Sequence, residues 1–212
     1  MSRENLAVPE LAAIDVKGVT RQSFIVRGAL TAGAVYGLGT VGPFVRQAIA
    51  QEGGGDVEIV NFALTLEYLE AAFYQQALER VSGLSGVAKE LATTIRENED
   101  VHVKALKATV KQLGGKPVMA PPVAFGNAFM SQESFLKLAQ TFEDTGVSAY
   151  NGAAPAIKSK EVLGAAGSIV QVEARHAAAI RALNGEQPAE GAFDQALGTE
   201  EVLKAVQPFV KA

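Results

Sequence analysis

The sequence predicts an all-α protein in which four long helices form an antiparallel bundle. A long crossover joins the second and third helices, and a short helix follows at the C-terminus. Alanine is abundant, tryptophan is absent and aromatic residues make up 7% of the 212 residues, a composition that favours helix over sheet. Apolar residues recur at helical spacing along four long segments. Glycine, proline and small polar residues separate these segments, as expected for the turns of a bundle.

The first two predicted helices follow one another closely. Residues 56–80 come after three consecutive glycines, with Asp56 placed to cap the helix, and carry an apolar stripe of Val60, Leu64, Ala71 and Leu78. The second predicted helix covers residues 87–113 and ends at two glycines followed by Pro117, a common stop signal. These helices are expected to form one antiparallel pair.

A long connection precedes the third predicted helix. Residues 114–130 hold three prolines and two phenylalanines and predict an ordered crossover. Ser131 is placed to cap a helix over residues 131–151, which Pro155 disturbs. The length of the crossover separates the first pair of helices from the second.

The fourth predicted helix completes the second pair. It covers residues 159–183 and stops at an Asn-Gly sequence. Thr199 is placed to cap a short terminal helix, whose Val206 and Phe209 are expected to dock on the bundle. Residues 51–212 are therefore predicted to form the bundle and its C-terminal tail.

The first fifty residues differ from the rest and predict an export signal. A basic stretch, residues 20–27, precedes eighteen uncharged residues, 28–45, and then the small-residue sequence Ala-Ile-Ala at 48–50. The segment resembles a twin-arginine signal, except that Gln22 stands where the second arginine is expected. Two alternatives remain open: an uncleaved helix that anchors the protein on a membrane, and a soluble arm that docks it to a larger assembly.

Composition excludes several classes of function. The chain has no cysteine, which excludes disulfides, zinc fingers, iron–sulfur clusters and thiol catalysis. The net charge is −4, and no basic patch interleaved with aromatic residues is present, so nucleic acid is not expected as a partner.

Both histidines of the chain lie three residues after a glutamate. The two motifs are Glu99–His102 and Glu173–His176, each within a predicted helix. Residues three apart lie on the same face of a helix, so each carboxylate and imidazole can bind a common metal ion. Apolar residues at helical spacing around both motifs place them toward the core. An ionised carboxylate is costly there unless a cation compensates it.

An internal repeat adds two further glutamates. The pattern Thr-apolar-Glu, with Tyr seven residues later, occurs at Glu67 and Tyr74 and again at Glu143 and Tyr150. Each copy precedes its Glu-x-x-His motif by a similar distance. One Glu from each of two helices and one Glu-x-x-His from each of the others form the ligand set of di-iron and di-manganese bundles. The predicted ligands of two iron or manganese ions are therefore Glu67, Glu99, His102, Glu143, Glu173 and His176.

Neighbouring polar residues leave alternatives open. Glu70 lies one turn beyond Glu67 and faces nearly the same way, but its counterpart in the repeat is Gly146, so it is predicted as a supporting or an additional ligand. Asp144, adjacent to a predicted ligand, is expected to point into solvent, as is Asp100. The two repeat tyrosines are expected to be core residues, to hydrogen-bond the ligand carboxylates, or to carry an electron.

Three segments resemble the bacterial ferritin-like domain proteins, a group that includes desiccation-related proteins. They are residues 61–70, 142–150 and 172–176, and the resemblance extends over residues 56–210. It implies a ferritin-like four-helix bundle with a metal centre, and it implies that a twin-arginine signal often precedes the domain. The ligand arrangement is more distantly similar to that of rubrerythrin, bacterioferritin and manganese catalase.

Two functions follow as hypotheses. In the first, a di-iron or di-manganese centre in the periplasm or cell envelope reacts with oxygen, peroxide or iron(II), as a ferroxidase or a peroxide-consuming enzyme. In the second, the metal only stabilises the bundle, and residues 1–50 dock it to a membrane or envelope assembly. Iron storage in a hollow cage is not expected, because the resemblance is not to cage-forming ferritins. Alanine-rich helix surfaces are suited to packing in a homodimer.

Overall fold

The computed structural model describes residues 55–211, which are helical with no strand. The predicted all-α architecture is confirmed for this part of the chain, whereas the predicted export segment lies outside the described residues. The helices are α3 (Asp56–Arg80), α4 (Gly86–Gln112), α5 (Gln132–Ala153), α6 (Lys160–Leu183) and α7 (Thr199–Val206), with single 3-10 turns at Ala154–Ala156 and Gln207–Phe209.

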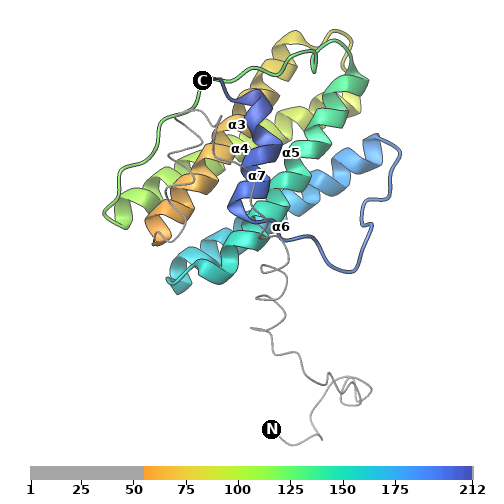
Figure 1. The fold of residues 1–212 in the computed structure, drawn as a ribbon. Helices are drawn as coiled ribbons and strands as arrows, with labels where there is room; N and C mark the ends of the chain where they lie inside the picture. The colour runs from red at the N-terminus through yellow and green to blue at the C-terminus, as the bar shows by residue number, and fades with distance from the viewer. Residues whose placement is uncertain (1–54, 212) are drawn as a thin grey trace, which may run out of the picture. The chain divides into compact units, whose positions relative to one another are not determined.

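The four long helices form a bundle of two pairs. As predicted, α3 packs mainly on α4 and α5 mainly on α6, and short connections make each pair antiparallel. The pairs meet where α3 contacts α5 and where α4 contacts α6. Figure 1 shows the long helices side by side, with α7 lying against α5. Among the helices of residues 55–211, none is both long and apolar enough to cross a bilayer.

The ends of the long helices agree with the predicted boundaries to within two residues, but the predicted caps Asp56 and Thr199 are wrong. Thr199 is the first residue of α7, whose N-cap is Gly198. Ser131 and Ser159 cap α5 and α6 through their side-chain oxygens, as local sequence suggests. Asp56 does not cap α3, whose N-cap is Gly55. Its carboxylate instead accepts hydrogen bonds from the backbone N–H groups of Lys158 and Ser159, at 2.8 and 2.7 Å. Asp56 thereby joins the start of α3 to the turn before α6.

The predicted crossover between α4 and α5 is ordered by one polar anchor and an aromatic cluster. The Asn61 amide donates to the Lys116 carbonyl and accepts from the Val118 N–H, at 3.2 and 2.9 Å. Further along, the crossover inserts two buried aromatic rings beside Phe73 on α3. The cluster comprises Phe73, Phe125, Phe129, Phe135, Phe142 and Phe209. Phe209 docks on the bundle as predicted from the sequence.

The segment between α6 and α7 lies directly on the C-terminal half of α5. The Leu197 N–H donates to the Ser148 carbonyl at 3.0 Å, and the Asn151 amide donates to the Gln195 carbonyl at 3.2 Å. A Cβ atom at Gly152 would lie 1.9 Å from the Leu197 carbonyl oxygen. Only a residue without a side chain therefore fits at this contact.

Gly152→Ala is expected to destabilise the fold, because the added methyl group would displace the backbone around Leu197. Overpacking of this kind costs about 1–3 kcal/mol. Gly164, inside α6, is a matched control, because a Cβ atom added there would meet no packed neighbour within 4 Å. Gly164→Ala should raise the free energy of unfolding by about 0.5–1 kcal/mol. Urea unfolding of both variants measures the two changes, and equal effects would contradict this account of Gly152.

Candidate metal centre

The structure brings all six predicted ligands together in the middle of the bundle. Each long helix contributes: Glu67 from α3, Glu99 and His102 from α4, Glu143 from α5, and Glu173 and His176 from α6. The four carboxylates are at most 1% exposed, and the two imidazoles are 8% and 5% exposed. Four ionisable carboxyl groups in a bundle core require compensation, since burial of an unpaired charge costs several kcal/mol.

The six side chains form two groups that share two carboxylates. In the first group, Nδ1 of His102 lies 3.2 Å from Glu67 Oε2, 3.1 Å from Glu99 Oε2 and 3.0 Å from Glu173 Oε1. In the second group, Nδ1 of His176 lies 3.2 Å from Glu99 Oε1, 3.3 Å from Glu143 Oε2 and 3.7 Å from Glu173 Oε2. Glu99 and Glu173 each present one oxygen to either histidine, whereas Glu67 and Glu143 belong to one group each.

Several of these atoms have no hydrogen-bond partner within the described chain. They are Glu99 Oε1, Glu143 Oε2, both Glu173 oxygens and His176 Nδ1. Such buried acceptors are rare in folded proteins, because each would lose its hydration without replacement. In each group, the available ligand atoms lie within 4.8 Å of one another. Carboxylate oxygens and imidazole nitrogens in this arrangement fit a divalent metal ion.

The protein alone compensates the buried charge only by holding protons. Burial raises the pKa of Glu143 to about 8. It also raises the pKa of Glu67 well above its usual range, and the neighbouring Glu173 raises it further. Burial opposes protonation of the two histidines, but the surrounding carboxylates, 3.0–3.7 Å from each Nδ1, raise both pKa values to about 12. No lysine or arginine is buried anywhere in residues 55–211 to share this role.

Each repeat tyrosine holds the carboxylate of the opposite helix pair. Tyr74 on α3 donates to Glu143 Oε1 on α5, and Tyr150 on α5 donates to Glu67 Oε1 on α3, both at 2.5 Å. Burial raises the pKa of both phenols well above 10, so both remain donors. Of the roles open from the sequence, the structure shows the hydrogen bond to a ligand carboxylate. The crossed pair fixes one oxygen of each carboxylate and leaves the other facing the histidines.

Of two acidic neighbours of the ligands, Glu70 lies where the sequence predicted and Asp144 does not. Glu70 is 3% exposed and lies beside the cluster, where burial and the nearby Glu173 and Glu143 carboxylates raise its pKa well above its usual range. Asp144 was expected to be solvated, and this prediction is wrong. Arg181 on α6 donates to its Oδ1 from Nε and Nη2, at 3.0 and 2.8 Å. The pairing of α5 with α6 brings these two side chains together across the interface.

Sequence reasoning missed Asn98, which contacts a predicted ligand from outside. Its side-chain Nδ2 lies 3.0 Å from Nε2 of His176, on the side of the ring away from the carboxylates. The signal in the sequence is its position directly before Glu99, but asparagine there has no specific meaning without the pairing of α4 with α6. Only the three-dimensional contact identifies it.

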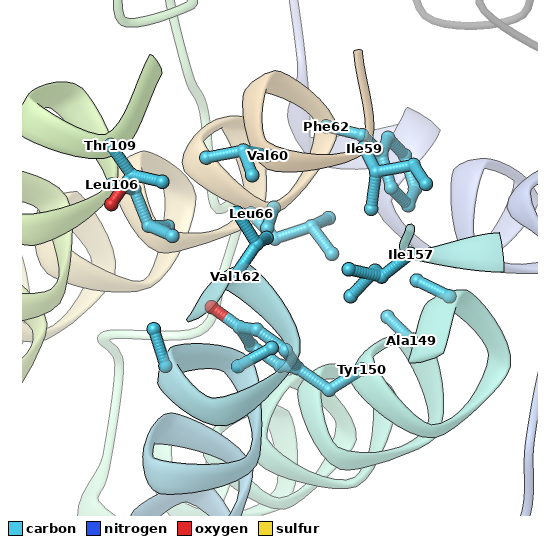
Figure 2. Close-up of a pocket in the computed structure, with 14 residues that line it drawn as sticks. Ile59, Val60, Phe62, Leu66, Leu106, Thr109, Ala149, Tyr150, Ile157 and Val162 are labelled. Atoms are coloured by element: carbon cyan, nitrogen blue, oxygen red, sulfur yellow. The ribbon is translucent and has the colours of Figure 1, made fainter. Parts of the chain in front are cut away.

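One end of the cluster is closed by apolar side chains. Tyr150, whose hydroxyl holds Glu67, also lines a small apolar pocket together with Ile59, Leu66, Leu106 and Val162 (Figure 2). The ring and its apolar neighbours separate that pocket from the carboxylates. The histidines are the more exposed members of the cluster.

A family model for the ferritin-like domain matches residues 55–186, more than half of the chain. The chain belongs to the ferritin-like domain family. The matched range covers all four long helices, and with them every residue of the buried cluster. None of the curated proteins compared with the chain matches it. The core of the ferritin-like domain thus holds a buried cluster of carboxylates and imidazoles that is suited to binding metal.

Proposed function

We propose that this ferritin-like domain binds two iron or manganese ions and uses them in redox chemistry with oxygen, peroxide or iron(II). The observation that carries the proposal is the pair of Glu/His groups with shared carboxylates. One ion would be held by Glu67 and His102, the other by Glu143 and His176. Glu99 and Glu173, which face both histidines, would bind both ions.

Charge balance supports two divalent ions. Five carboxyl groups are buried at the centre, and the described part of the chain buries no lysine or arginine beside them. Two divalent ions carry four positive charges, which equals the charge of Glu67, Glu99, Glu143 and Glu173 when the histidines are neutral ligands. The fifth carboxyl group, Glu70, belongs to neither group of ligand atoms, and burial raises its pKa well above its usual range. A single divalent ion would leave two carboxylates uncompensated.

The donor set supports iron or manganese over other ions. Each group offers three carboxylates and one imidazole, and no thiolate ligand exists in a chain without cysteine. Such oxygen-rich sites with some nitrogen suit iron(II) and manganese(II), and the same set recurs in the carboxylate bundles. When bound, either metal supplies electrons for reactions with oxygen or peroxide.

The surrounding residues position the ligands of the proposed centre. Tyr74 and Tyr150 orient the two terminal carboxylates, and the aromatic cluster and apolar pocket exclude water from their ends of the site. The donor set suits iron and manganese, which have two accessible oxidation states, and this favours the redox function over a structural one.

The setting of this activity is proposed from the sequence. Residues 1–50 have the order of an export signal, so the domain is proposed to work in the periplasm or cell envelope, with the segment either cleaved or retained as a membrane anchor. The alternative function is a subunit of an envelope assembly that docks through residues 1–50 and uses metal for stability alone. A homodimer through alanine-rich surfaces is compatible with both functions.

Metal exchange separates the two functions. The full-length protein loaded with iron or manganese is expected to consume peroxide or to oxidise iron(II) over many turnovers. The zinc-loaded protein should be equally folded but inactive, because zinc has no accessible second oxidation state. Oxygen electrodes and peroxide assays measure the turnover. If all three loaded forms are equally stable and equally inactive, the structural function is correct and the redox proposal fails.

A further inference from the structure

The internal repeat makes the two metal groups similar. Positions at which the two copies of the repeat have different residues show where the groups differ. Glu67 corresponds to Glu143, Glu99 to Glu173, and each histidine and tyrosine to its partner in the other pair. The correspondence fails at two positions beside the cluster. Asn98 corresponds to Val172, and Glu70 corresponds to Gly146. Both differences lie outside the six ligands, and both add a polar group to one half only.

The first difference gives one histidine a hydrogen-bond partner that its counterpart does not obtain from the equivalent position. Asn98 contacts Nε2 of His176 at 3.0 Å while Nδ1 of the same ring faces the carboxylates. When Nδ1 of His176 is the ligand atom, Nε2 carries the proton. Rotating the Asn98 side-chain amide by 180° places Oδ1 at Nε2, where it accepts a hydrogen bond from Nε2–H. Val172 has no polar atom with which to hold Nε2 of the His102 ring. The Nε2 side of the His176 ring is thus held by Asn98 before an ion arrives.

The second difference adds a carboxyl group to the same side. A Cβ atom at position 146 would lie 3.1 Å from Glu70 Oε1 and 3.8 Å from Glu173 Oε2. That Glu173 oxygen is the one nearer His176 Nδ1, at 3.7 Å. Gly146 has no side chain, and the Glu70 carboxylate occupies the space that this leaves on α5, one turn from Glu143. Glu70 therefore extends the acidic surroundings of the His176 group.

We infer that the two metal positions are unequal, and that the position at Glu143 and His176 fills first. The inference rests on the proposed di-metal function and assigns Asn98 as a positioning residue. Loss of such an outer hydrogen bond lowers metal affinity by about 10–100-fold in other sites. A difference of that size makes loading sequential: one ion at the His176 position, then a second at the His102 position.

Calorimetric titration of the metal-free, full-length protein with manganese(II) tests the inference. The wild type is expected to show two binding steps whose dissociation constants differ by about tenfold or more. Asn98→Val, which copies the other half of the repeat, should weaken the tighter step about tenfold or more and bring the two steps together. Asn98→Asp keeps an acceptor for Nε2 and should retain two separate steps. Equal steps in the wild type, or separate steps unchanged in Asn98→Val, would overturn the inference.

A second measurement locates the first ion without a variant. Crystals of the wild type grown with one equivalent of manganese(II) should show anomalous scattering beside His176 and little beside His102. Equal peaks, or a stronger peak beside His102, would contradict the inference while leaving the di-metal proposal intact. Failure of the di-metal proposal itself has a different signature, because the titration would then show one ion or none per chain.

Discussion

Glu99→Gln is expected to abolish tight binding at both metal positions, because this side chain presents one oxygen to each histidine, at 3.1 and 3.2 Å. The amide preserves volume but removes the charge and replaces one ligand oxygen with a donor. Outer-sphere substitutions already cost about 10–100-fold in affinity, so loss of a shared ligand should exceed about 100-fold for both ions. Equilibrium dialysis against manganese(II), followed by elemental analysis, measures the loss.

Two other substitutions distinguish this effect from general damage. Glu97→Gln on the same helix changes a side chain that is 65% exposed, and it should bind metal as the wild type does. Glu67→Gln removes a carboxylate of one group only and should weaken one of the two ions much more than the other. If Glu99→Gln retained two tightly bound ions, the proposed sharing of this carboxylate would be wrong.

The metal-free protein is expected to lose stability as the pH rises from 5 to 9. Burial raises the pKa of Glu143 to about 8 from 4.5, so the folded state holds this proton more tightly than the unfolded state does. Its contribution is complete below about pH 4.5 and is lost as the pH approaches 8. The histidines, with pKa values raised from 6.5 to about 12, act in the same direction above pH 6.5. Their combined loss corresponds to a fall in melting temperature of at least about 5 °C.

Bound metal should reverse this dependence. Ligands must lose their protons to bind, so metal affinity rises with pH, and the stabilisation by saturating manganese(II) rises with it. Scanning calorimetry at each pH, with chelator and with manganese(II), measures both curves.

Glu143→Gln removes one of the titrating groups and should flatten the metal-free curve. Burial opposes ionisation of Glu99, but the two neighbouring histidines lower its pKa to about 2, so it acts in the opposite direction only below pH 4.5. A metal-free melting temperature that rose between pH 5 and 9 would contradict the proposed charge arrangement.

Much of the fold could be predicted because its signals are local. Serine caps, glycine stops and the run of prolines in the crossover each act on neighbouring residues, and the four long helices begin and end within two residues of their predicted bounds. Asp56 shows the limit of such reasoning. Its carboxylate can accept from its own helix or from any free N–H nearby, and the backbone of residues 158 and 159 reaches it only after the bundle closes.

The cluster was predictable because its chemistry repeats at helical spacing. Two Glu-x-x-His motifs and two Thr-apolar-Glu segments define six residues that the fold places within reach of one another. Asn98 and the pairing of Asp144 with Arg181 were not predictable, since each depends on which helix faces which. Glu70 was correctly placed beside Glu67, but only the space above Gly146 shows how a fifth carboxyl group is accommodated.

Elemental analysis of the full-length protein, expressed with both iron and manganese supplied, tests the central claim most directly. The account predicts two ions of iron or manganese per chain, each removed only by a chelator. Circular dichroism on the same sample establishes that the bundle is folded. A folded protein that carries no metal, and that takes up none when manganese(II) is added at pH 8, would contradict the claim that this cluster is a di-metal centre.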